Sequence, residues 1–110
     1  DGARPVRRAQ GRNILEPNKP RYSIIVPVYN EEEVLPELYR RLTGAMDKLE
    51  EPYEVLLIND GSQDRSAEMM RDLHRRDPRF KLVNFSRNFG HQVAISAGMD
   101  YASGDAVIII

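Results

Sequence analysis

Four short runs of apolar and β-branched residues recur along the chain, and each has the composition of a β-strand. These runs are Tyr22–Tyr29, Tyr53–Asn59, Phe80–Phe85 and Ala106–Ile110. They start roughly 30 residues apart, which is the length of a strand–helix–strand unit. The second and fourth runs are almost continuously apolar, so we expect strands that are buried on both faces of a parallel sheet.

Between these runs, apolar residues recur at helical spacing. The first stripe comprises Val34, Leu35, Leu38, Leu42, Ala45, Met46 and Leu49, the second Ala67, Met70 and Leu73, and the third Val93, Ala94, Ala97 and Tyr101. Alternating strands and helices predict a parallel sheet with right-handed crossovers. The predicted fold class is therefore α/β, with a Rossmann-like, mostly parallel sheet flanked by helices.

Several residues indicate where the helices begin and end. Proline is best placed in a first turn, so Pro36 predicts a helix that starts at about Glu32–Leu35. We expect Asp64 or Ser66 to cap the second helix and Gly104 to end the third.

The two ends of the chain differ from its middle. Residues 1–21 contain three prolines and two glycines, and we interpret them as a basic tail or linker that precedes a folded part at residues 22–110. The last strand has no helix after it, which would leave an apolar strand uncovered. We therefore expect the chain to be part of a longer protein, truncated after the fourth strand.

The composition excludes several kinds of site. With no cysteine and two histidines among 110 residues, zinc fingers, iron–sulfur clusters and thiol nucleophiles are excluded. A metal would have to be held by carboxylates, which favours Mg²⁺ or Mn²⁺. No apolar run reaches the ~20 residues of a membrane span, so this segment is expected to be soluble. The basic head of a chain with net charge −1 is interpreted as solvated, so no nucleic-acid partner is expected.

Polar residues follow the first three strands, at the edge where open parallel sheets bind ligands. Tyr29 offers a ring on which a planar base can stack, and Glu31 can accept a base or ribose proton; the alternative for Glu31 is an interaction with the helix dipole. Asp60 can accept from the imide N–H of uracil or from ribose hydroxyls, whereas the alternative is a simple Asp-Gly turn.

The third loop has the composition of a phosphate site. Arg87 and Asn88 precede Gly90 at a helix start, so a guanidinium, backbone N–H groups and a helix dipole could together receive a phosphate. The alternative is that Arg87 pairs with a nearby acid. The sequence contains no GxGxxG, P-loop or GxSxG motif, so a nucleotide would be bound without these glycine-rich signatures.

Four motifs, in order and in register, resemble a known family. Ile24–Glu31, Ile58–Asp64, Ser86–Gly90 and Ser96–Gly98 resemble the amino-terminal half of inverting family 2 glycosyltransferases. The likeness covers residues 22–110 and is greatest to the polyprenyl-phosphate branch, which includes dolichol-phosphate mannosyltransferases and bactoprenol glucosyltransferases.

The resemblance implies a GT-A fold, a nucleotide-sugar donor, expected to be a UDP-sugar, and a polyprenyl-phosphate acceptor. In relatives, the residues that match Pro27, Tyr29, Glu31, Ile58 and Asp60 line the nucleoside pocket. The assignment of Arg87 and Asn88 to phosphate contacts is our inference. Where the family commonly has aspartate, this chain has Asn59, which several relatives share. The base is left open between uracil and guanine, and the sugar is not determined.

The resemblance also implies features beyond Ile110. These are an acidic Asp-x-Asp-type motif that holds Mg²⁺ or Mn²⁺, the groups that activate the acceptor, and carboxy-terminal membrane helices. The acceptor phosphate would attack the anomeric carbon directly while the metal stabilises the leaving diphosphate. The catalytic residues are thus unknown, and the 110-residue piece alone is expected to be inactive.

The parent protein would then act at the cytoplasmic face of a bacterial inner membrane, and a homo-oligomer is compatible with the sequence. Two alternatives stay open. One is a glycosyltransferase with a polysaccharide or soluble acceptor, and the other is a non-catalytic α/β binding module.

Overall fold

Seven elements alternate along the chain in a computed structural model, which describes residues 19–110. In order they are β1 (Tyr22–Val28), α1 (Leu35–Asp47), β2 (Tyr53–Asn59), α2 (Ser66–Arg76), β3 (Phe80–Asn84), α3 (His91–Tyr101) and β4 (Ala106–Ile109). The predicted tail lies mostly at residues 1–18, outside the described residues. Arg21 is described: its backbone N–H donates to the Pro52 carbonyl, and its carbonyl accepts from the N–H of Ala106.

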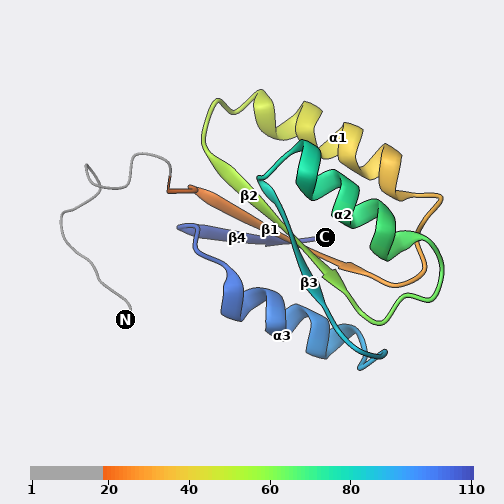
Figure 1. The fold of residues 1–110 in the computed structure, drawn as a ribbon. Helices are drawn as coiled ribbons and strands as arrows, with labels where there is room; N and C mark the ends of the chain where they lie inside the picture. Colours follow the sequence, from red (N-terminus) through yellow and green to blue (C-terminus); the bar gives the residue numbers. More distant parts are fainter. Residues whose placement is uncertain (1–18) are drawn as a thin grey trace.

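The four strands form one parallel sheet in the order β3-β2-β1-β4 (Figure 1). Helices α1 and α2 cover one face of the sheet and α3 covers the other (Figure 1). This confirms the predicted α/β class. Val28, Asn59 and Asn84 are partners in register, so β1, β2 and β3 end level and their following loops leave from the same edge.

The two faces of the sheet bury unequal cores. Residues of β1 alternate between the faces, with Ile24 and Val26 under α1 and α2 and Ile25 under α3. The core under α1 and α2 contains twelve buried residues, whereas the core under α3 contains four. Most of the stabilising apolar burial therefore lies on the α1/α2 side.

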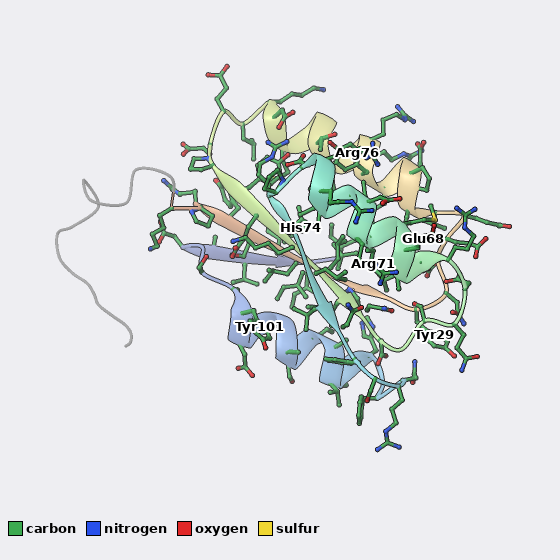
Figure 2. All side chains as sticks on the ribbon, in the orientation of Figure 1. Tyr29, Glu68, Arg71, His74, Arg76 and Tyr101 are labelled. Carbon is green, nitrogen blue, oxygen red and sulfur yellow. The ribbon has the colours of Figure 1, made fainter. Side chains whose placement is uncertain are left out.

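Three expectations about the end of the chain are wrong. The fourth strand is not buried on both faces: β4 is exposed along its whole length at the sheet edge, where it pairs only with β1, and this matches the other expectation, that no helix would cover it. Tyr101, assigned to an apolar stripe, is the last residue of α3, and its side chain is 62% exposed (Figure 2). Helix α3 ends at Tyr101 rather than at Gly104; a Cβ on Gly104 would lie 2.8 Å from the Ser23 Oγ, so this glycine permits a close approach to β1.

The predicted start of the first helix is confirmed, since α1 begins at Leu35 with proline in its first turn. The second helix begins at Ser66, whose N–H donates to an oxygen of Asp64 (2.8 Å). The N-cap residue is Arg65, so neither Asp64 nor Ser66 is the N-cap as predicted, although Asp64, one residue earlier, does accept from the first helical N–H. The Ser66 hydroxyl instead accepts from the N–H of Glu31 in the preceding loop.

Two glycines in helices have opposite surroundings and provide a matched test of packing. A Cβ on Gly98 in α3 would lie 2.4 Å from Cγ2 of the buried Ile25, whereas a Cβ on Gly44 in α1 would meet nothing within 4 Å. We expect Gly98→Ala to lower the free energy of unfolding by about 1–3 kcal/mol through overpacking. Gly44→Ala should raise it by about 0.5–1 kcal/mol. Urea denaturation checks both, and equal effects of the two substitutions would contradict the close contact between α3 and β1.

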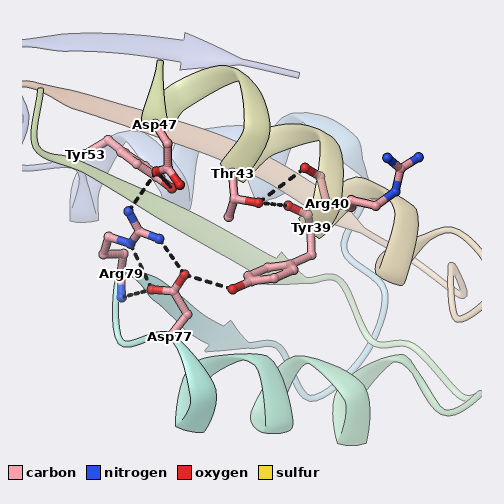
Figure 3. Close-up of polar contacts among 7 residues, drawn as sticks. All are labelled: Tyr39, Arg40, Thr43, Asp47, Tyr53, Asp77 and Arg79. Carbon is pink, nitrogen blue, oxygen red and sulfur yellow. Dashed lines mark hydrogen bonds and ion pairs between the residues drawn. The ribbon is translucent and has the colours of Figure 1, made fainter. Parts of the chain in front are cut away.

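A polar cluster joins the ends of α1 and α2 to the start of β3 (Figure 3). The buried Asp77 carboxylate accepts from Nε and Nη2 of Arg79 (2.9 and 2.8 Å) and from the Tyr39 hydroxyl (3.1 Å). The Arg79 guanidinium holds the pKa of Asp77 below its usual value. Arg79 also contacts Asp47 and stacks over the ring of Tyr53, and burial raises the pKa of Tyr53 to about 12.

A buried carboxylate on β2 joins three further segments. Glu54 is 2% exposed and accepts from the Ser23 hydroxyl (2.6 Å), from Lys81 Nζ (2.8 Å) and from both the N–H and the hydroxyl of Ser103. Burial acts to raise the pKa of Glu54, but the hydrogen bonds from Lys81, Ser23 and Ser103 outweigh it and leave the pKa lowered. This carboxylate ties the segment before β4 to the sheet.

Candidate functional site

Three loops meet at the carboxyl edge of β1, β2 and β3. They comprise residues 29–34, 60–65 and 85–90, and we call them the first, second and third loops. Because the strands end level, these loops lie side by side (Figure 1). The predicted gathering of the polar loops at one edge is confirmed.

The first two loops are joined by reciprocal hydrogen bonds. Asn30 has a positive φ of 53°; its N–H donates to the Ser62 Oγ (2.9 Å), and its Oδ1 accepts from the N–H of Gln63 (2.8 Å). The N–H of Glu31 donates to the Oγ of the fully buried Ser66 (2.8 Å). Further bonds run from the Glu32 N–H to Asp64 and from the Arg65 N–H to Glu32. The two loops therefore form one braced unit.

Asp60 connects the second loop to the third. Its residue is only 4% exposed, and its carboxylate accepts from the N–H of Phe89 (2.8 Å), the N–H of Gly90 (3.2 Å) and the side-chain amide of Asn88 (3.2 Å). This places a carboxylate at the amino terminus of α3, where the helix dipole favours it. Gly90, the N-cap residue, has no side chain to serve there.

The predicted site residues differ in how accessible they are. Tyr29 is 45% exposed, and Glu31 and Arg87 are exposed as well. Pro27 is half-buried in β1, opposite the buried Ile58 of β2. These residues thus lie at the edge where the three loops meet, with three side chains open to solvent.

Direct contacts link only some of the predicted residues. Asn88 bonds to Asp60, but within residues 19–110 no hydrogen bond or ion pair joins the side chains of Tyr29, Glu31 and Arg87. The Arg87 guanidinium stands over the ring of Phe89, 4.6 Å from its centroid. The alternative in which Arg87 pairs with a nearby acid therefore finds no partner in the described part of the chain.

Sequence reasoning missed the residues that brace the loops. Asn30, Ser62 and Ser66 make the bonds between the first and second loops, yet only a capping role was predicted for Ser66. A signal was present, because short side chains that bond to nearby backbone cluster in both loops. Each bond, however, spans about 30 residues, so the partners were not visible in the local pattern.

Two other properties of the described segment bear on function. Across residues 19–110, no three acidic or histidine side chains gather closely enough to hold a metal ion. Residues 19–110 therefore do not offer a set of ligands that fits a metal site. Nor does any helix in this range have the length and apolarity needed to cross a membrane.

Comparison with known proteins gives a consistent result. The family model described as "Glycosyl transferase family 2" matches residues 23–110. The chain is 60% identical over 89 residues to the uncharacterized glycosyltransferase YkcC of Bacillus subtilis, covering 81% of this chain and 28% of that relative. It is 45% identical over 89 residues to the undecaprenyl-phosphate 4-deoxy-4-formamido-L-arabinose transferase of Salmonella paratyphi A, covering 80% and 27%. The chain thus spans little more than a quarter of the length of these relatives.

Solved structures share the fold. S. aureus TarS 1-349 in complex with UDP is similar with a TM-score of 0.68 at 23% identity, over 82% of this chain and 26% of that one. The mannosyltransferase PcManGT of Pyrobaculum calidifontis, in complex with GDP-Man and Mn²⁺, gives a TM-score of 0.59 at 26% identity, over 81% and 26%. The same arrangement therefore occurs in a protein solved with UDP and in a mannosyltransferase solved with GDP-Man.

Proposed function

Since the chain belongs to glycosyl transferase family 2, we propose that it forms the donor-nucleotide-binding part of an enzyme that transfers a sugar from a UDP-sugar to a polyprenyl phosphate. The observation that carries the proposal is the carboxyl edge of the sheet. There, an exposed tyrosine and an exposed arginine stand on loops fixed by a buried aspartate and by bonds between loops. Ligands of open parallel sheets bind at this edge.

The first and second loops suit the nucleoside. The exposed ring of Tyr29 offers a face on which a base can stack, and Glu31 beside it offers a carboxylate to hydroxyl or N–H donors. Pro27 is half-buried and offers apolar surface near the end of β1, whereas Ile58 is fully buried in the core under α3 and supports this region from beneath. Asp60 has fewer free acceptor positions than the sequence implied, because its oxygens already accept three hydrogen bonds from the third loop.

The third loop suits the diphosphate. Arg87 is exposed and supported by the Phe89 ring, and guanidinium groups bind phosphate oxygens in a bidentate manner. Asn88 is a weaker candidate for a phosphate contact, since its amide group donates to Asp60. The ligands named for two solved structures of similar fold, UDP and the nucleotide sugar GDP-Man, support a nucleotide-containing ligand.

The acceptor is proposed from a relative. The Salmonella protein that shares 45% identity is named for undecaprenyl phosphate, and a lipid acceptor would place the parent protein at a membrane. A divalent ion, as named for the Pyrobaculum enzyme, would neutralise the diphosphate. We propose that it is held by residues of the parent other than 19–110, since these show no ligand cluster.

Tyr29→Ala is expected to weaken binding of UDP to the whole protein about tenfold, because stacking on an aromatic ring contributes about 1–3 kcal/mol per base. Isothermal titration calorimetry measures this change. Tyr101→Ala is the matched control: this tyrosine is also exposed, but it lies at the far end of α3 (Figure 2). Equal affinity of the two variants for UDP would remove Tyr29 from the site.

The acceptor is tested separately by transfer of a labelled sugar from UDP-sugars into undecaprenyl phosphate. Label in the organic phase supports the proposal. Label found only in polysaccharide or soluble sugar would assign the other acceptor, and UDP binding without any transfer would favour a binding module.

A further inference from the structure

Beyond Phe85, which packs on the core under α3 and donates its N–H to the Asn59 carbonyl, the third loop contacts the second loop through two consecutive residues, Asp60 and Gly61. Within residues 86–90, the four hydrogen bonds that lead to another loop all end on Asp60: three on its carboxylate and one, from the Asn88 amide, on its carbonyl. By contrast, the first and second loops share bonds from several residues. Within residues 86–90, the hydrogen bonds to another loop therefore all depend on Asp60.

Gly61 is the second attachment. Its φ is +77°, and a Cβ at this position would lie 2.3 Å from the carbonyl carbon of Arg87 and 2.4 Å from the nitrogen of Asn88. The peptide bond between Arg87 and Asn88 thus rests directly on the Gly61 backbone. Any side chain here would push the third loop outward, and the positive φ would add strain.

Two contacts connect the Asp60 carboxylate, through Phe89, to the guanidinium of Arg87. The carboxylate holds the N–H of Phe89, and the Phe89 ring lies under the guanidinium of Arg87. We propose that Asp60 and Gly61 are positioning residues that seat the third loop, so that Arg87 faces the donor diphosphate. This inference rests on the proposed function and changes the role of Asp60, which sequence reasoning assigned to the nucleoside.

The burial of Asp60 favours a positioning role. A carboxylate that is 4% exposed and already accepts three hydrogen bonds is satisfied by the protein itself. Moving a phosphate-binding arginine by even an ångström weakens an interaction that depends on bidentate geometry. A positioning role and a direct contact with the base predict different effects on binding. Loss of positioning weakens the binding of ligands that carry phosphates, whereas loss of a base contact weakens the binding of uridine as well.

Gly61→Ala in the whole protein tests whether Gly61 positions the third loop, and it removes no polar group. We expect UDP to bind about tenfold more weakly by calorimetry, the size of one charge-assisted hydrogen bond, while uridine binding by ligand NMR is unchanged. Arg87→Ala should give the same pattern. Adding Gly61→Ala to Arg87→Ala should cause little further loss, because the two act through one interaction.

A second variant is needed in case Gly61→Ala does not fold. Thermal unfolding of each variant checks whether it is folded. Phe89→Leu removes the ring under Arg87 at an exposed position and should also weaken UDP but not uridine. If the folded Gly61→Ala and Phe89→Leu variants bound UDP as tightly as wild type, or lost uridine binding to the same extent, Asp60 and Gly61 would not be positioning residues for the third loop. The proposed function would still stand. A wild-type protein that binds neither UDP nor uridine would overturn both.

Discussion

Replacing Asp77 by alanine is expected to lower the free energy of unfolding by about 1.5–3 kcal/mol, the range for hydrogen bonds to a charged group. The carboxylate is buried and accepts from two nitrogens of the Arg79 side chain and from the Tyr39 hydroxyl. Its removal leaves the half-buried hydroxyl without this acceptor and separates the end of α2 from α1 (Figure 3). Urea denaturation at pH 7 measures the loss.

Asp72 offers the matched control, since it lies on α2, the helix that Asp77 directly follows. It pairs with Arg75 on the surface, where both side chains are at least half exposed, and such pairs contribute about 0–1 kcal/mol. Asp72→Ala should therefore change the unfolding free energy little. If the two alanine variants lost similar stability, the cluster around Arg79 would contribute no more than a surface ion pair.

Glu54→Gln is expected to cost about 2 kcal/mol at pH 7 and much less near pH 3. In the folded protein the pKa of Glu54 lies below its usual value of 4.5, because its hydrogen-bond donors outweigh burial. A carboxyl of this kind stabilises the fold at pH values above 4.5. That contribution is lost as the pH falls through the lowered folded pKa, where the wild-type side chain also becomes neutral.

The difference between wild type and variant, followed by denaturation from pH 7 to 3, isolates Glu54 from other carboxylates. Glu51→Gln is the control, since Glu51 is exposed three residues earlier in the chain. We expect its difference from wild type to be near zero throughout. A Glu54→Gln difference that stayed constant with pH would show that shape rather than charge matters at this position.

The predicted strands match the structure to within one residue at their ends because each run is locally consistent: β-branched residues continue until a polar loop begins. The errors arise where a distant neighbour decides. The position of Gly104 is explained by the backbone of β1, about 80 residues away, and this is not visible in the spacing of apolar residues. The apolar run of β4 alone suggested burial on both faces, whereas the absence of a following helix correctly indicated an uncovered strand.

The site was predictable to the level of loops. Topology alone brings the residues after parallel strands to one edge, and this gave the positions of Tyr29, Asp60 and Arg87. The sequence did not reveal that Asp60 is covered by the third loop, because its partners follow 28 to 30 residues later. A buried carboxylate and an exposed one have the same letter in the sequence.

The unequal cores have a mechanical consequence for this edge. The first and second loops lead into α1 and α2, over twelve buried residues, whereas the third loop leads into α3, over four. The loops that we propose for the nucleoside therefore rest on the larger core, and the loop that we propose for the phosphates rests on the smaller one. Because a segment over few buried apolar contacts opens more readily, we expect residues 86–90 to be the more mobile part of this edge, held by their contacts with Asp60 and Gly61.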